Sequence, residues 1–201
     1  PAPLRKILRA THTTRYDAGT QARNPPRPAP STKTVPVVRQ DSSGKAENFT
    51  KFRAAASPPT FAIKPGGQPE WPASITTRSP GNSGVAGSVK STEGGIGYVD
   101  LADAKSAGLT FASIKNKAGK AVQPTVASAA AALSATTVND DLTYNPLNAA
   151  GDAAYPITAP TWVLVYAKQT DPQKAVLLKS FLGFLVGDGQ KLAEANDYAA
   201  L

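Results

Sequence analysis

A short strand, a polar turn and a helix follow one another in the stretch Val37-Val38-Arg39-Gln40-Asp41-Ser42-Ser43-Gly44-Lys45-Ala46-Glu47-Asn48-Phe49-Thr50. The adjacent valines predict a buried strand, and the Ser-Ser-Gly run predicts a turn that leads into a helix. The backbone N–H groups of such a turn converge where the helix dipole favours negative charge. We therefore expect this turn to hold a small oxyanion.

Side chains of the same turn add further donors. Arg39 offers a planar fork of N–H groups, and Ser43 offers a hydroxyl. Asp41 follows Arg39 by two residues, so it is placed to orient the guanidinium before any ligand arrives. An alternative stays open at this point, because Asp41 or Ser42 would also serve as an ordinary helix cap.

Positive charge is concentrated at the front of the chain. Of 22 Lys and Arg against 14 Asp and Glu, residues 1–53 carry eleven basic and three acidic side chains, and the remaining residues carry eleven of each. Such a front part should attract anions. The basic residues lie among Pro, Ala and Thr without interleaved aromatic residues, so we expect no specific nucleic-acid partner.

Composition excludes several other classes of site. The chain has no Cys, which excludes disulfides, zinc thiolate centres and cysteine nucleophiles. Apolar runs are all shorter than the roughly eighteen residues of a membrane span, so we expect no transmembrane segment. A chain that begins with Pro1 and contains no Met is expected to be processed or cut from a longer precursor.

Candidates for catalysis are weak. The single histidine, His12, lies in a Thr-rich stretch, and Asp140, Asp141 and Asp152 lie in a segment where Asp is a normal turn residue. The glycines between 94 and 97 precede a predicted strand, whereas a dinucleotide-binding loop precedes a helix. We expect no enzyme, no metal site and no cofactor.

Apolar periodicity predicts strands that alternate with helices, which is typical of an α/β architecture. The expected strands are Val35–Val38, Ile96–Val99, Thr110–Ile114 and Thr161–Ala167. The expected helices are residues 4–10, a helix after the turn that Ser57 ends, one that starts near Asn82, Val126–Leu133, one that starts at Asp171, and Lys191–Asn196. Residues 24–30 are rich in proline and should be extended.

Five motifs in one order resemble the periplasmic phosphate-binding proteins of ABC-type phosphate uptake, the PstS family. The family's Arg-x-Asp-x-Ser-Gly-Thr turn and Asn-Phe-Thr helix are matched from Arg39 to Thr50. The other matches are Gly81-Asn82-Ser83-Gly84-Val85, Thr92-Glu93-Gly94-Gly95-Ile96-Gly97-Tyr98-Val99, Tyr155-Pro156-Ile157-Thr158 and the closing Asp197-Tyr198-Ala199-Ala200-Leu201.

The resemblance implies a type II periplasmic-binding-protein-like lobe, with a mixed sheet flanked by helices. Residues 1–154 would form the second-lobe-like domain with its basic N-terminal segment, and residues 155–201 would be the C-terminal strand and helices that return to the first lobe. Phosphate would bind to Arg39, Ser43, Gly44 and Lys45, with Asp41, Gly81 and Asn82 in support. The implied location is extracytoplasmic, and the implied partners are phosphate or a phosphoryl group and an ABC permease.

Two departures from the family pattern limit this reading. Lys45 stands where the family has Thr, and most of the first lobe would be encoded ahead of this region. An apolar strand and helix between residues 161 and 186 would then lack their neighbours, unless a longer polypeptide, another subunit or repacking covers them. The alternative function is a non-transporting extracytoplasmic interaction module that binds a polyanion or a protein.

Overall fold

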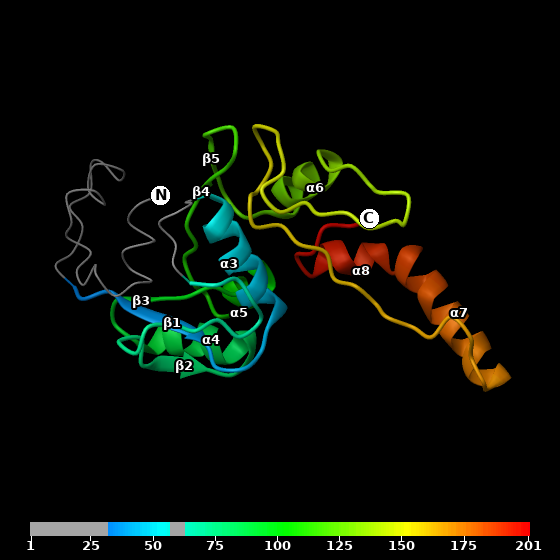
Figure 1. The fold of residues 1–201 in the computed structure, drawn as a ribbon, viewed down its shortest axis with the longest axis horizontal. Helices are drawn as coiled ribbons and strands as arrows, with labels where there is room; N and C mark the ends of the chain where they lie inside the picture. The colour runs from blue at the N-terminus through cyan, green and yellow to red at the C-terminus, as the bar shows by residue number, and fades with distance from the viewer. Residues whose placement is uncertain (1–31, 57–62) are drawn as a thin grey trace.

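The computed structural model describes residues 32–56 and 63–201, which form a small parallel sheet with helices and a longer C-terminal part (Figure 1). The expected helix over residues 4–10, the proline-rich residues 24–30 and His12 lie outside the described residues. No helix of the described part is long and apolar enough to cross a membrane.

The central strand of the main sheet is β1 (Val35–Arg39). It pairs in parallel with β2 (Thr77–Ser79) on one side and with β3 (Gly95–Ile96) on the other. Val37 and Val38 point to opposite faces of the sheet, and both are almost fully buried. A strand that is covered on both faces reads as a continuous apolar run, which is why the valines predicted it.

Helices connect the parallel strands. The chain passes from β1 through α3 (Gly44–Ala56) to β2, and from β2 through α4 (Gly81–Ser91) to β3. The carboxyl ends of β1 and β2 lie at one edge of the sheet, in the register Arg39 with Ser79. The first turns of α3 and α4 therefore begin at that same edge, which is where ligands bind in open α/β sheets.

Aromatic packing fixes α3 on the sheet. The core cluster consists of Val38, Phe49, Ile63, Trp71 and Ile75. The ring of Tyr98 stacks on Phe49 with centroids 4.6 Å apart, and Trp71 lies 6.1 Å from the same tyrosine ring. This arrangement places the Tyr98 hydroxyl next to the end of β1, where it accepts a hydrogen bond from the backbone N–H of Arg39.

A single mixed sheet was expected, but the parallel and antiparallel strand pairs lie in two separate sheets. The three-stranded sheet is parallel throughout, and the antiparallel pair of β4 (Ile114–Lys115) and β5 (Ala121–Val122) stands apart from it. The strand expected over residues 110–114 is thus shorter and begins later. On the turn side, pairing ends at Lys115 with Ala121, because residues 116–120 form the turn that closes the hairpin.

Two capped helices follow the predicted boundaries closely. In α6 (Val126–Ser134), Thr125 and Ser128 form a reciprocal capping box. In α7 (Pro172–Val186), the Asp171 side chain accepts from two backbone N–H groups of the first turn. The last helix is α8 (Gln190–Ala195). The short helix α5 (Leu101–Ser106) was not predicted from the sequence.

One strand prediction is wrong. Residues 161–167 form no strand, because no described segment runs beside them to supply the ladder of hydrogen bonds that a strand needs. Helix α7 buries none of its residues and extends away from the sheet in Figure 1. The large apolar side chains exposed here include Leu164 at 93%, Leu177 at 70% and Phe181 at 55%.

Candidate functional site

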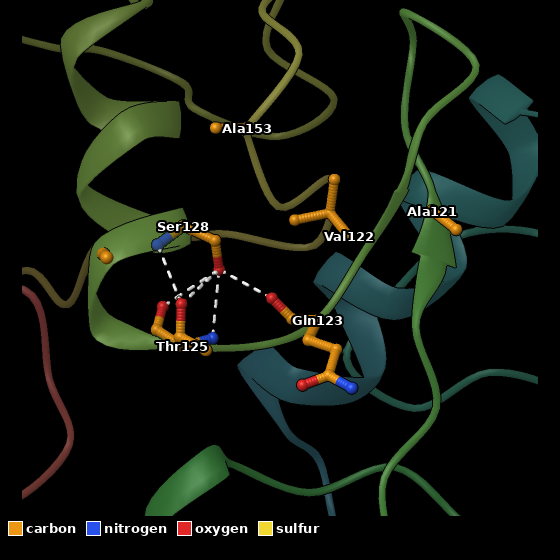
Figure 2. A pocket seen from close by; sticks show the side chains of 7 residues that line it. Ala121, Val122, Gln123, Thr125, Ser128 and Ala153 are labelled. Carbon is orange, nitrogen blue, oxygen red and sulfur yellow. Dashed lines mark hydrogen bonds between the residues drawn. The ribbon is translucent and has the colours of Figure 1, made fainter.

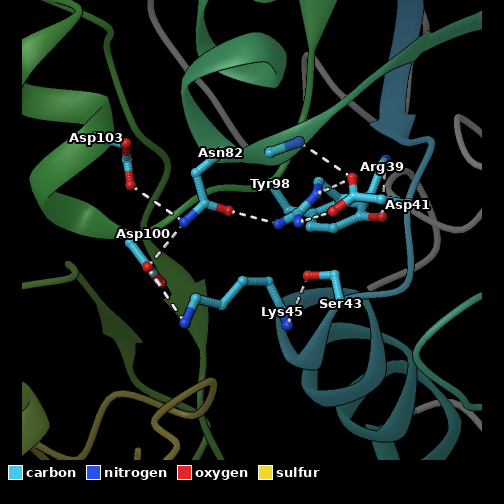
Figure 3. Close-up of polar contacts among 9 residues, drawn as sticks. Arg39, Asp41, Ser43, Lys45, Asn82, Tyr98, Asp100 and Asp103 are labelled. Carbon is cyan, nitrogen blue, oxygen red and sulfur yellow. Dashed lines mark hydrogen bonds and ion pairs between the residues drawn. The ribbon is translucent and has the colours of Figure 1, made fainter.

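A row of polar side chains crosses the sheet edge at which α3 and α4 begin (Figure 3). Arg39 ends β1, Asn82 lies in the first turn of α4, and Lys45 lies in the first turn of α3. Asp100 immediately precedes α5. The fold thus brings together side chains that are up to sixty-one positions apart in the sequence.

Arg39 is held by every nitrogen of its guanidinium. Its Nε donates to Asp41 Oδ1 over 2.9 Å, its Nη2 donates to the other oxygen of that carboxylate, and its Nη1 donates to Asn82 Oδ1 over 2.8 Å. Only 10% of the Arg39 side chain is exposed. The contact with Asp41 that the sequence predicted is therefore present, and it raises the pKa of Arg39 above its ordinary value.

Asp41 joins the ends of two elements. Besides the Arg39 guanidinium, it accepts the backbone N–H of Gly81 over 3.0 Å, at the start of α4. The bond to Arg39 first, and the bond to Gly81 second, hold the pKa of the Asp41 carboxyl well below its usual range. Gly81 has φ +63, a conformation that glycine adopts at little cost. The positions expected to support the site, Asp41, Gly81 and Asn82, thus all contact one another or Arg39.

The turn itself is capped by Ser43, and neither Asp41 nor Ser42 is the cap. Ser43 Oγ accepts the backbone N–H of Lys45 over 3.1 Å, and the N–H of Ser43 donates to the carbonyl of Gly67 over 2.8 Å. Within the described part of the chain, no acceptor receives the N–H of Gly44. A Cβ placed on Gly44 would meet nothing within 4 Å, so the space beside its Cα is open.

The side chain of Lys45 leaves the turn and runs toward Asp100 (Figure 3). Its Nζ lies 3.2 Å from Asp100 Oδ2, with 38% of the lysine side chain and 21% of the aspartate side chain exposed. Asn82 Nδ2 donates to the same Asp100 oxygen over 2.9 Å and to Asp103 Oδ2 over 3.1 Å. Asn82 therefore connects the arginine to both carboxylates.

Sequence reasoning missed Asp100, Asp103 and Tyr98 as parts of this network. Tyr98 Oη accepts the backbone N–H of Arg39 over 3.2 Å, and burial raises the pKa of Tyr98, which keeps its hydroxyl neutral. A signal for Asp100 was available in the sequence. It follows a predicted strand, and the carboxyl ends of parallel strands meet at the edge where α3 and α4 begin.

The C-terminal segment reaches the acidic side of this network. Lys105, at the end of α5, forms an ion pair with Asp197. Burial raises the pKa of Tyr198, and the charges of Asp100 and Asp103 raise it further. The closing residues of the chain thus lie close to the carboxylates that hold Asn82 and Lys45.

A surface depression elsewhere in the chain has few groups that could bind or react with a ligand. It lies between β5 and α6 and is lined by Ala121, Val122, Gln123, Thr125, Ala127, Ser128 and Ala153 (Figure 2). None of these side chains is charged, and Ser128 Oγ already donates to the Gln123 carbonyl over 2.7 Å. The described residues contain no group of three or more His, Cys, Asp or Glu that could hold a metal ion. The network around Arg39 is the stronger candidate.

Comparison of the sequence with known proteins identifies the family of the chain. A family model described as a PBP superfamily domain matches residues 1–189. The chain belongs to this superfamily. The resemblance found in the sequence motifs, and the α/β class with a parallel sheet flanked by helices, are confirmed.

Curated members of the superfamily are similar over most of this chain. The phosphate-binding protein PstS of Xylella fastidiosa (strain 9a5c) is 33% identical over 92% of the chain and 51% of its own length. PstS of Methanocaldococcus jannaschii is 34% identical over 81% of the chain and 46% of its own length. PstS3 of Mycobacterium bovis (strain BCG) is 29% identical over 97% of the chain and 54% of its own length. This PBP superfamily chain spans about half the length of the curated relatives it matches.

Proposed function

We propose that this chain binds inorganic phosphate, or a phosphoryl group of the same chemistry, as a non-catalytic binding component of phosphate uptake. One observation carries the proposal. The guanidinium of Arg39 is held at every nitrogen, at the sheet edge where α3 begins and where the N–H of Gly44 has no acceptor among the described residues. The names of the similar proteins, which are phosphate-binding, support the choice of anion.

The proposed donors differ in how far the free protein already orients them toward an anion. Arg39 supplies a fixed positive charge, and the N–H of Gly44 supplies a donor at the start of a 13-residue helix. Ser43 Oγ accepts the N–H of Lys45 in the structure, so its own hydroxyl hydrogen is available to donate to an oxyanion. Asp41, Gly81 and Asn82 keep the guanidinium in place. Binding then requires little rearrangement of the backbone.

A site on one lobe binds weakly, because half of the ligand stays in water and opposing donors are lacking. We place the complementary half on a further lobe, which corresponds to the half of the relatives' length that this chain does not match. The exposed apolar side chains of residues 161–166 and α7 are its contact surface. Residues 1–154 then form the anion-binding domain, and residues 155–201 form the connection to the other lobe.

Within this function, the chain acts outside the cytoplasm and delivers its ligand to an ABC permease. The role needs no catalytic group, metal or cofactor. It needs a site whose charges are arranged before the ligand arrives, and the bonds from Asp41 and Asn82 to Arg39 supply such an arrangement.

Isothermal titration of the chain with phosphate, with sulfate in parallel, tests the proposal. We expect saturable binding of phosphate that persists at physiological salt and is lost in Arg39→Ala. Arg78→Ala is the matched control, since Arg78 is an exposed arginine on the neighbouring strand β2. Arg39→Lys keeps the charge without the fork and should weaken binding about tenfold.

Two results would contradict phosphate binding. One is the absence of heat with phosphate in the unmodified chain, and the other is equal binding by the folded Arg39→Ala variant. Binding to polyanions that disappears at moderate salt, without any response to phosphate, would instead support the interaction module. Circular dichroism of each variant establishes that it is folded.

A further inference from the structure

The two cations of the site are held in different ways. Arg39 makes three side-chain contacts and is 10% exposed. Lys45 makes one ion pair, with Asp100, and is 38% exposed on a flexible four-carbon stem. Of these two cations, Lys45 is therefore the one that can rearrange when an anion enters.

Asp100 is held more firmly than its partner. Its Oδ2 accepts from the Asn82 amide over 2.9 Å, and that amide is itself fixed by Arg39 on its oxygen side. The carboxylate is 21% exposed and directly precedes α5, so its position is set by the fold. In Figure 3 the lysine stem extends toward this carboxylate and away from Arg39.

Acidic groups of the network outnumber the basic ones. Among the described side chains in Figure 3, Arg39 and Lys45 face three carboxylates, those of Asp41, Asp100 and Asp103. Asp41 is committed to Arg39, and Asp103 contacts Asn82. Asp100 is the carboxylate that neutralises Lys45.

On the basis of the proposed function, we infer that Asp100 is an internal competitor for the phosphate ligand and thereby sets the affinity of the site. In the free protein it holds the ammonium of Lys45. When phosphate binds at the turn, it gains the Lys45 charge only by drawing that charge from Asp100. Asp100 and Lys45 together are thus affinity-determining residues, and the Lys45 side chain is a donor whose contribution Asp100 limits.

The test compares Asp100→Asn with Asp103→Asn by titration with inorganic phosphate at low salt. Both variants remove one negative charge from the same network and keep an acceptor for Asn82, but only the first releases Lys45. We expect Asp100→Asn to bind phosphate about two- to fivefold more tightly, as removal of one partly exposed ion pair allows. Asp103→Asn should change the affinity by less than about twofold.

Lys45→Ala completes the cycle. In the Lys45→Ala background, Asp100→Asn should no longer raise the affinity, because there is no ammonium to release. Equal gains with and without Lys45, equal gains in Asp100→Asn and Asp103→Asn, or no gain in Asp100→Asn would each overturn the inference.

Failure of the inference is distinguishable from failure of phosphate binding itself. If the unmodified chain binds phosphate and Asp100→Asn binds no better, phosphate binding stands and the role of Asp100 is refuted. If the unmodified chain is silent, phosphate binding is refuted, and a gain in Asp100→Asn would show only that this variant creates a site. If both are silent, both are refuted.

Discussion

The Nη1 of Arg39 lies 2.8 Å from the amide oxygen of Asn82, and this bond links the end of β1 to the first turn of α4. The other end of the same amide donates to Asp100 and Asp103. Asn82 thus presents an acceptor to a cation and donors to two anions. An amide side chain carries both kinds of group, whereas an ionised carboxylate only accepts and an ammonium or guanidinium only donates.

Replacement of Asn82 by Ala should weaken phosphate binding about tenfold, because Arg39 loses a charge-assisted contact and some of its fixed orientation. Asn82→Asp should weaken it further, since a third carboxylate would face Asp100 and Asp103. Titration calorimetry measures both effects. Asn139→Ala serves as control because Asn139 bonds only within its own exposed loop. Wild-type affinity in Asn82→Ala would show that Asp41 alone orients the arginine.

Gly94→Ala should lower the free energy of unfolding by about 3 kcal/mol or more. Gly94 has φ +73, and a Cβ there would lie 1.9 Å from the carbonyl oxygen of Lys33. Gly108→Ala is the control, since Gly108 has φ +67 with open space around it and should cost only about 1 kcal/mol. Urea unfolding of both variants separates the steric effect from the backbone effect, and equal losses would contradict the close approach of Lys33.

Stability should fall at alkaline pH through Tyr155. Burial raises the pKa of Tyr155 to about 12, above its ordinary value of 10. Because the folded pKa is the higher one, this contribution to stability is fully present below pH 10 and is lost as the pH rises through 12. The loss is about 3 kcal/mol.

Tyr155→Phe removes the ionisable group and should flatten this part of the profile, as measured by urea unfolding at a series of pH values. Tyr166→Phe removes a phenol that is 85% exposed and should leave the profile unchanged. An unchanged slope in Tyr155→Phe would show that another group causes the alkaline loss.

Charged substitutions on the exposed apolar surface should be tolerated by the isolated chain. Leu164→Asp and Phe181→Asp should change the free energy of unfolding by less than about 0.5 kcal/mol and should reduce self-association in sedimentation experiments. Phe52→Ala, at a fully buried position, should cost about 3 to 5 kcal/mol. A large loss in Leu164→Asp would mean that this residue is buried in solution.

Local signals predicted the half of the site that lies close together in sequence. The valines of β1, the Ser43-Gly44 turn and Phe49 give a strand, a turn and a buried helix face without reference to distant residues. The approach of Arg39 and Asp41 also follows from their spacing. Their roles toward phosphate stay a prediction.

What the sequence could not supply depends on pairing between distant segments. Residues 161–167 have the composition of a strand, but a strand exists only beside a partner, and the described chain gives it none. The strand β3 begins at Gly95, where its partner β1 also begins with Val35, and it pairs over only two residues. The contact of Lys45 with Asp100 likewise requires the first turn of α3 to meet the start of α5, which spacing along the chain does not encode.

The position of β1 in the sheet also governs the order in which the fold can assemble. Val37 pairs with Thr77 and Val35 pairs with Gly95, so the central strand meets both neighbours only after much more chain has been made. The entropy of closing these long loops is lost before the hydrogen bonds between the strands form, and this slows folding. A partly synthesised chain that ends before Gly95 would therefore leave the β3 side of β1 unpaired and open to pairing with another chain.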